Sequence, residues 1–340
     1  MKIILYKNEK QEWDDYIKSS SNSNIYHQIA WKEIIENFFG HKAYYLIAKE
    51  DDSLRGVLPL FLMKSRLFGK FIVSLPFHCI GGVCADDDTT KKGLVEAAIR
   101  LTKEEGADYL ELRGTDKVEA GLVTRDHKAS FILDLNPGID KIWSLFRKQT
   151  RNRIRKAEKS DLTVKFGHEY IREFYDCDAR HMRDLGLPGH KFDFFKMVLE
   201  TFPPDSQIAI IVHKGKTIAA KFFMFYKNKV HLIWGASSKN AKELMPNYLL
   251  TWEVIKYALG LGYRYCDFGR STVETGPYHF KESWGGELKP LYWQYYLNNG
   301  AKIPDLSPSN SKYNIAISIW KKLPMPVVEF IGPKIVKHIP

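Results

Sequence analysis

A chain of 340 residues with 44% hydrophobic and 14% aromatic residues can bury more than one core, which excludes a disordered chain and favours two domains. The formal charge of +11 favours acidic partners such as nucleic acid, nucleotide phosphates or an anionic membrane face. Four unevenly spaced cysteines disfavour a disulfide framework, and no paired His/Cys motif accompanies them, so we expect no metal. The chain has no apolar run of roughly 18 residues and no signal-peptide pattern, so we expect a cytoplasmic protein.

The first half of the chain alternates strand-like and helix-like segments. Residues 44–48 and 54–63, on either side of a polar turn at 51–53, predict a hairpin. A helical pattern over 91–105 ends at Gly106, and the apolar alternation over 108–114 predicts the next strand. These elements form one α+β unit.

The second half repeats this order at an offset of about 160 residues. It has strands at 208–212, 218–226 and 230–234, a helix over 247–259, and a strand over 264–270. We therefore predict an α+β fold of two similar mixed-sheet domains flanked by helices. Turn residues at 136–138 place the first domain at 1–138 and the second at 139–304. The tail, 305–340, either packs back on the first domain or touches a membrane surface with Trp320, Lys321, Lys322, Phe330 and Lys337.

A strongly basic segment follows the predicted domain boundary. Seven of the thirteen residues from Arg147 to Lys159 are cationic. Arg147, Arg151 and Arg155 have i, i+4 and i+8 spacing, so a helix would place them on one face, where their repulsion would be relieved by an anionic partner. A solvated helix face is the alternative interpretation. Because it precedes a cluster of chemistry-capable residues, we favour binding of a phosphate-bearing donor or acceptor.

That cluster runs from Asp267 to Arg270 and from Gly276 to Gly286, where glycines permit close approach of a ligand to the backbone. Lys281 could neutralise a phosphate or the oxyanion formed when an amine attacks an ester. Tyr278, Phe280 and Trp284 alternate, which predicts a strand with at least some of these rings in the core. The chain has no Walker A, Gly-x-Gly-x-x-Gly, Gly-x-Ser-x-Gly or His-Glu-x-x-His motif, so nucleotide hydrolysis, dinucleotide redox chemistry, serine hydrolysis and zinc proteolysis lose support.

Several of these segments, in this order, resemble the FemAB family over essentially the whole chain. The matching segments are Thr150-Arg151-Asn152-Arg153-Ile154-Arg155-Lys156-Ala157, Trp234-Gly235-Ala236-Ser237, Met245-Pro246-Asn247-Tyr248, Asp267-Phe268-Gly269, Tyr278-His279-Phe280-Lys281, and the tail from Leu323-Pro324 to Gly332-Pro333. The resemblance implies two tandem acetyltransferase-like (GNAT-like) domains, the second inserted in the first, with residues 305–340 returning to the first. It also implies a metal-independent aminoacyltransferase that moves an amino acid from aminoacyl-tRNA to an amine of a peptidoglycan precursor.

The resemblance also implies roles for particular residues. Phe280 and Lys281 match an active-site pair whose lysine contacts the donor and supports the transition state. Family members place an Asp after a first-domain strand, where this chain has Glu111. The tentative general base is therefore Asp267 or Glu111, and Asp267 could equally be a structural acid that fixes the glycine turn. Further substrate-binding candidates are Arg147, Arg151, Arg155, Arg270, Tyr278 and Trp234.

Other functions remain open on the sequence alone. An acyltransferase that uses acyl-coenzyme A or an acyl carrier to modify an amino sugar of a surface polysaccharide is one alternative. The chain lacks the Gln/Arg-x-x-Gly-x-Gly/Ala loop that binds the coenzyme A pyrophosphate, which disfavours that donor. A non-catalytic binder of RNA or anionic lipid is the other. We therefore expect no resident cofactor, a phosphate-bearing acyl donor and an envelope amine as partners, and at most peripheral contact with the inner membrane surface.

Overall fold

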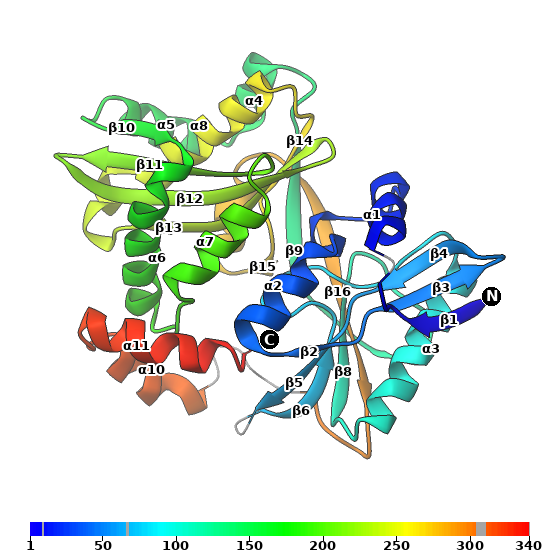
Figure 1. Ribbon diagram of the computed structural model, residues 1–340. Coiled ribbons are helices and arrows are strands. Elements are labelled where there is room, and N and C mark those ends of the chain that lie inside the picture. The colour runs from blue at the N-terminus through cyan, green and yellow to red at the C-terminus, as the bar shows by residue number, and fades with distance from the viewer. Residues whose placement is uncertain (9, 66–67, 304–310, 340) are drawn as a thin grey trace. The chain divides into compact units, whose positions relative to one another are not determined.

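The computed structural model describes all residues except 9, 66–67, 304–310 and 340 (Figure 1). The chain forms two compact units. Unit 1 comprises Met1–Ala129, Pro290–Leu306 and Lys337–Pro340, and unit 2 comprises Ser130–Lys289 and Ser307–Val336. The first boundary therefore lies earlier than the expected 138/139, and the expected boundary at 304/305 lies outside the described residues.

Unit 1 contains two sheets. The first has the order β1-β3-β4-β7 and is built from β1 (Lys2–Leu5), β3 (Leu46–Glu50), β4 (Ser53–Leu58) and β7 (Cys84–Ala85). The second has the order β16-β8-β6-β5-β2 and is built from β2 (Lys42–Ala43), β5 (Phe61–Ser65), β6 (Gly69–Val73), β8 (Tyr109–Gly114) and β16 (Glu287–Leu297), the last from residue 290 onward. Helices α1 (Lys10–Ser19), α2 (Ala30–Phe39) and α3 (Asp88–Glu104) complete the unit.

The core of unit 1 forms where α3 packs on these strands. Asp87 caps the helix by accepting a hydrogen bond from the Thr90 amide, and Leu94, Ala98 and Leu101 fall on one helix face. Those side chains are buried against apolar strand residues such as Leu110. The helix predicted over 91–105 is thereby confirmed as α3.

Unit 2 has six strands in the order β10-β11-β12-β13-β14-β9. They are β10 (Thr163–Phe166), β11 (Ser206–His213), β12 (Lys216–Tyr226), β13 (Lys229–Ser237), β14 (Tyr265–Asp267) and the end of β9 (Val123–Asp134), with β15 (Ser271–Thr272) beside it. The helices are α4 (Ile139–Leu145), α5 (Lys148–Glu158), α6 (Ile171–Leu185), α7 (Phe192–Thr201), α8 (Pro246–Gly260), α9 (Gly276–Glu282), α10 (Asn314–Trp320) and α11 (Met325–Val336).

Helices cover both faces of the unit 2 sheet, as Figure 1 shows. Neighbouring residues of β12 point to opposite faces: Phe222 contacts Phe174 of α6, whereas Phe223 contacts Tyr257 of α8. Helix α7 lies on the α6 side, and α5 packs on α8. The sheet is thus buried between an α6/α7 layer and an α5/α8 layer.

Each unit contains one parallel strand pair whose strands are separated in sequence by a helix. In unit 1, β6 pairs with β8 across α3, and in unit 2, β13 pairs with β14 across α8. The duplicated α+β unit predicted from the sequence is therefore confirmed. This pairing also explains the boundary: β14 pairs with residues 132–134 of β9, so the strand predicted at 131–135 belongs to unit 2.

Two expectations about local structure are wrong. The segment containing Tyr278 and Phe280 is helix α9 and not a strand, because Pro277 stands in its first turn, where proline favours a helix start. The tail helices α10 and α11 belong to unit 2 and not to the first domain: α11 packs on α6, and Ile317 lies against Gly186.

The strands β13 and β14 separate after a short parallel pairing. Their ladder covers Lys229–His231 and Tyr265–Asp267, after which β13 continues along β12 while β14 ends. A bulge falls where Phe222 pairs with Trp234 and Phe223 with Leu232, and a bulge of this kind re-aims the side chains around it. The resulting fork is where the candidate site is built.

Candidate active site

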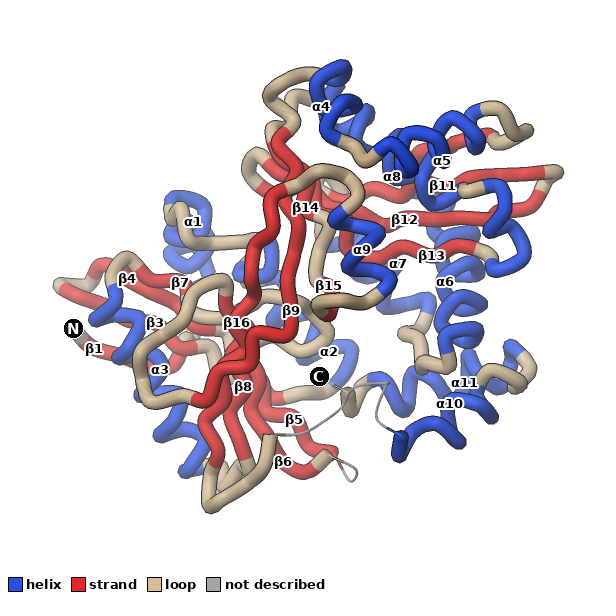
Figure 2. Tube along the Cα trace, turned by 180° about the vertical axis from the view of Figure 1, so that it is seen from behind, coloured by secondary structure: helices blue, strands red, loops and turns tan. Residues whose placement is uncertain are grey.

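Lys281 lies on α9 at the fork between β13 and β14. Its Nζ donates hydrogen bonds to the carbonyl oxygens of Gly269 (2.8 Å) and Arg270 (2.7 Å), in the turn that follows β14. Gly269 has φ +69°, and a Cβ there would lie 3.1 Å from the Leu232 carbonyl oxygen, so the turn requires glycine. Figure 2 shows α9 beside β15. The two hydrogen bonds to carbonyl oxygens fix the position of the ammonium group of this half-buried lysine.

An aromatic cluster packs against Phe280, the residue that precedes Lys281. The Phe280 ring lies 5.0 Å from Tyr248, at the start of α8, and 5.9 Å from Trp284. Trp284 is fully buried against Phe146. These contacts attach α9 to the α5/α8 side of the sheet, so Phe280 shapes the backbone that carries Lys281.

The basic segment is confirmed as helix α5, and it is bonded to the same region. Arg147 precedes the helix; its Nη2 pairs with Glu282 Oε2 at 2.8 Å, and its amide donates to the Ser283 carbonyl. Thr150 Oγ1 donates to Ser283 Oγ at 2.9 Å. Arg153 lies over the Tyr248 ring at 5.0 Å. The cations of α5 are thereby held next to the Lys281 segment.

Arg151 and Arg155 contact α4 instead. Arg151 Nη1 donates to the Ser144 carbonyl oxygen at 3.1 Å, and Arg155 lies over the Trp143 ring at 5.4 Å. Arg155 is exposed and Arg151 is half-buried. Their guanidinium groups remain placed for phosphate, and phosphate binding by this helix stays a prediction.

Asp267 is buried and accepts three hydrogen bonds. They come from Ser130 Oγ (2.6 Å), the Gly269 amide (2.8 Å) and His231 Nδ1 (3.3 Å). Burial alone would raise the pKa of this carboxyl, but the bonds from His231, Ser130 and Gly269 outweigh it and hold the pKa at about 2. Such a carboxylate is a poor proton acceptor at neutral pH. Of the two expected roles of Asp267, the geometry supports the structural one, which fixes the glycine turn.

Two further residues of this region were missed by the sequence interpretation. His231 is buried on β13, with Nδ1 held by Asp267 and with an Nε2 that has no partner among the described residues. Lys221 is buried on β12, and burial, together with the nearby charge of Lys281, lowers the pKa of its ammonium to about 8. Each is a lone polar residue inside an apolar strand, which is the signal that could have revealed it.

Two residues predicted to contact a ligand, Tyr278 and Trp234, pack against aromatic neighbours within unit 2. Tyr278 is buried, with its ring 5.0 Å from Phe131. Trp234 packs edge-on against Phe195 and Phe222 on the α6/α7 side of the sheet, away from the layer that carries Lys281. Packing against aromatic neighbours disfavours a ligand contact by these two rings, and that contact stays a prediction. Arg270 stays a prediction: its carbonyl holds Lys281, and its side chain is half-buried.

Glu111 belongs to unit 1, where it is buried beside an arginine. Its Oε1 accepts a hydrogen bond from Arg113 Nε at 2.7 Å. Arg113 also donates to the His78 carbonyl oxygen and lies over the Trp293 ring at 4.4 Å. A carboxylate already paired with a buried guanidinium is disfavoured as a general base, because protonation would leave that charge uncompensated.

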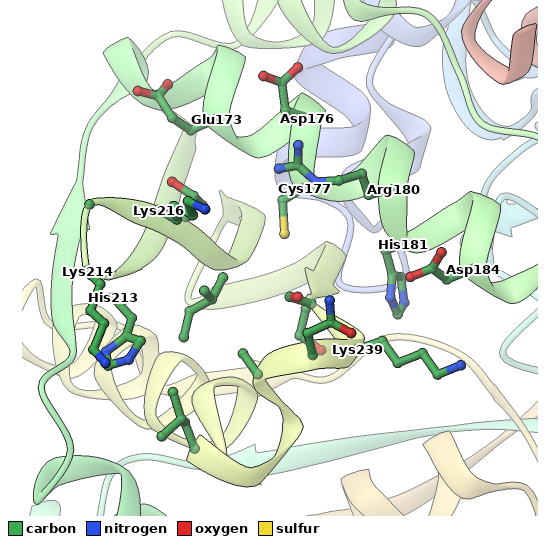
Figure 3. Close-up of a pocket in the computed structure, with 18 of the residues that line it drawn as sticks. Glu173, Asp176, Cys177, Arg180, His181, Asp184, His213, Lys214, Lys216 and Lys239 are labelled. Atoms are coloured by element: carbon green, nitrogen blue, oxygen red, sulfur yellow. The ribbon is translucent and has the colours of Figure 1, made fainter. Parts of the chain in front are cut away.

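A cavity of about 860 Å³ lies elsewhere in unit 2 (Figure 3). It is bounded by α6, the turn between β11 and β12, and the residues that follow β13. Its lining mixes charges, with Asp176 and Arg180 on α6, Lys214 on the turn and Lys216 at the start of β12. Burial raises the pKa of Cys177, which lines it, to about 12, so this thiol stays protonated and is a poor nucleophile. None of the sequence-predicted site residues lines this cavity.

The strand fork, with a helix between its parallel strands, defines a GNAT-type acyltransferase domain. Comparison with known proteins agrees: the family described as acetyltransferase (GNAT) domain matches residues 144–282. The lipid II:glycine glycyltransferases of Staphylococcus epidermidis and Staphylococcus haemolyticus are 28% identical, over 31% of this chain. The chain spans only 28% and 27% of the length of these two relatives.

Solved structures extend the similarity in fold to both units. A crystal structure of FemX superposes with a TM-score of 0.69 at 17% identity, covering 88% of this chain and 98% of that one. A tandem GNAT protein from the clavulanic acid biosynthesis pathway gives a TM-score of 0.59 at 10% identity, covering 89% and 99%. The expected pair of GNAT-like domains is thereby confirmed, and the chain is similar to FemX in fold and to the lipid II:glycine glycyltransferases in part of its sequence.

Proposed function

We propose that this protein is an N-acyltransferase of FemAB type that transfers an aminoacyl group from aminoacyl-tRNA to an amine of a peptidoglycan precursor or related cell-envelope acceptor. The observation that carries the proposal is Lys281, whose ammonium group is fixed at the strand fork by the carbonyls of Gly269 and Arg270. In the reaction the amine attacks the ester carbonyl carbon, the new C–N bond forms, and the C–O bond to the ribose breaks. The amine loses one proton and the ribose oxygen gains one.

Lys281 supplies the electrostatic part of this reaction. Negative charge develops on the carbonyl oxygen as the amine attacks, and a pre-positioned ammonium group stabilises it without reorganisation. Because two backbone carbonyls hold Nζ in place before substrate arrives, the stabilisation costs little at the moment of reaction. No covalent enzyme intermediate is needed.

The start of α8 favours a donor other than coenzyme A. Pyrophosphate binding at a helix start needs free backbone N–H groups. Pro246 has none, and the Tyr248 amide already donates to the Met245 carbonyl oxygen at 3.1 Å. The cations of α5, by contrast, suit the phosphates of an RNA acceptor end.

The tail helices suit a lipid-linked acceptor, the class named in the staphylococcal relatives. Helix α10 exposes Ile315 (77%) and Ile319 (57%) at i, i+4, and the lysines at 321 and 322 follow it. Phe330 of α11 is 68% exposed. Apolar side chains among lysines are typical of a surface that rests on an anionic membrane. No helix among the described residues is long and apolar enough to cross one.

The test is a donor comparison. Purified protein is mixed with labelled aminoacyl-tRNA or with labelled acyl-coenzyme A, each with lipid-linked and nucleotide-linked peptidoglycan precursors, and the label is followed into the acceptor. The proposal expects transfer from tRNA only. Transfer from acyl-coenzyme A alone, or RNA binding that weakens with salt but gives no transfer, would each overturn it.

A further inference from the structure

Lys221 is a buried cation inside an apolar strand. Its side chain is 6% exposed, and the flanking residues of β12, Ala220 and Phe222, are fully buried. The groups that act on its pKa besides burial are Lys281 and Cys266, and neither is a carboxylate. A buried charge without a partner costs folding free energy, so its presence in a core strand needs another reason.

The residue that pairs with Lys221 in the neighbouring strand is an exposed glycine. In the β12–β13 ladder Lys221 pairs with Gly235, which is exposed. A Cβ at position 235 would lie 3.3 Å from Lys221 Nζ. The ammonium group therefore lies close to an exposed position that carries no side chain.

The second cation of this region is Lys281. Lys221 and Phe223 are two residues apart in β12, so their side chains point to the same face of the sheet, the face on which Phe223 packs against α8. The contact of Phe280 with Tyr248 of α8 places Lys281 on that face as well. The charge of Lys281 is close enough to lower the pKa of Lys221, after the larger effect of burial. The third titratable group that acts on Lys221 is Cys266; burial raises the pKa of its thiol, so it stays neutral and supplies no counter-charge. Two ammonium groups thus share one region, and the missing charge is negative.

We propose that Lys221 binds one anionic group of a substrate, a phosphate or a carboxylate, which approaches over Gly235, while the charge of Lys281 adds to the attraction for that anion. Lys221 is then a specificity-determining residue of the transfer site, because an ammonium there disfavours a cationic or apolar group and favours an anionic one. The inference rests on the proposed function for the identity of the substrate. Anion binding is measured without any acyl transfer, so a failure of this inference can be distinguished from a failure of the proposed function.

The experiment is thermal unfolding at pH 7 with increasing inorganic phosphate or sodium acetate, at ionic strength held constant with sodium chloride. Four proteins are compared: the parent, Lys221→Met, Gly235→Ala, and the control Lys216→Met, which removes an exposed lysine from the same strand. The parent and the control should gain several degrees, saturably, with at least one of the two anions. The anion that acts, phosphate or acetate, identifies the class of group.

Lys221→Met should lose this gain and should have a higher Tm than the parent without anion, because the substitution removes an unpaired buried charge. Gly235→Ala keeps the lysine and adds a methyl group 3.3 Å from its Nζ, so it should weaken the anion effect at least tenfold in midpoint concentration. Equal anion-dependent gains in the parent and Lys221→Met would overturn the inference. The lack of any gain in the parent would also overturn the inference. If Lys221→Met does not fold, an anion response of Gly235→Ala as strong as that of the parent would overturn it.

Discussion

Replacing Asp267 with asparagine should destabilise the protein by an amount that depends on pH. The carboxylate is buried and accepts bonds from Ser130, Gly269 and His231, which hold its pKa at about 2 against an ordinary value of 3.8. A difference of that size corresponds to about 2 kcal/mol of folding free energy. Because the folded-state pKa is the lower one, this contribution is complete above about pH 4 and is lost as pH falls towards 2.

Urea unfolding at pH 7, 4 and 3 measures this dependence. Asp267→Asn should be less stable than the parent by roughly 2 kcal/mol at pH 7 and by nearly as much at pH 4, with the gap about halved at pH 3. Asp52→Asn is the control, because Asp52 is exposed in a turn whose positive φ suits asparagine equally well. A gap that does not change with pH would refute the reasoning, since it would show that the ionised carboxylate is not what stabilises the turn.

Two further substitutions test other parts of unit 2. Burial raises the pKa of Asp178 on α6 to about 7, so its ionisation should oppose folding increasingly as pH rises from about 4 to 7. Asp178→Asn should therefore gain ~2 kcal/mol more stability at pH 8 than at pH 5. Equal gains in urea unfolding at both pH values would contradict this. Gly285 has φ +73°, and a Cβ there would lie 2.6 Å from the Leu145 carbonyl oxygen, so Gly285→Ala should lose about 2–4 kcal/mol by the same assay. Gly276→Ala is its control, because a Cβ at that position meets no atom within 4 Å, and comparable losses in the two variants would refute the steric argument.

Local patterns in the sequence predicted the regular elements well. The cation spacing of the basic segment indicated helix α5, and the helical pattern over 247–259 indicated α8, because both depend on interactions a few residues apart. The alternating rings at 278, 280 and 284 indicated a strand, and here Pro277 was the stronger signal. Its position in the first turn of α9 decides the conformation.

The rest depends on non-local pairing, which a single sequence does not display. The boundary at 129/130 is set by the pairing of β14 with the end of β9, and α11 belongs to unit 2 because it packs on α6. The lysine of the predicted Phe280-Lys281 pair does lie at the strand fork, whereas Glu111 is paired with an arginine. Lys221 and His231 stand out in the sequence as lone polar residues of apolar strands, but their positions relative to β14 follow only from the strand pairing.

The most direct test of the account is the single-turnover rate of aminoacyl transfer from charged tRNA by Lys281→Met, a change that keeps the length of the side chain and removes its charge. Lys196→Met, an exposed lysine of α7, is the matched control, and thermal unfolding verifies that each variant is folded. We expect the rate of Lys281→Met to fall by about 10²–10³ while the control retains the parent rate. Transfer by a folded Lys281→Met at the parent rate would contradict the central claim that this ammonium group stabilises the transition state.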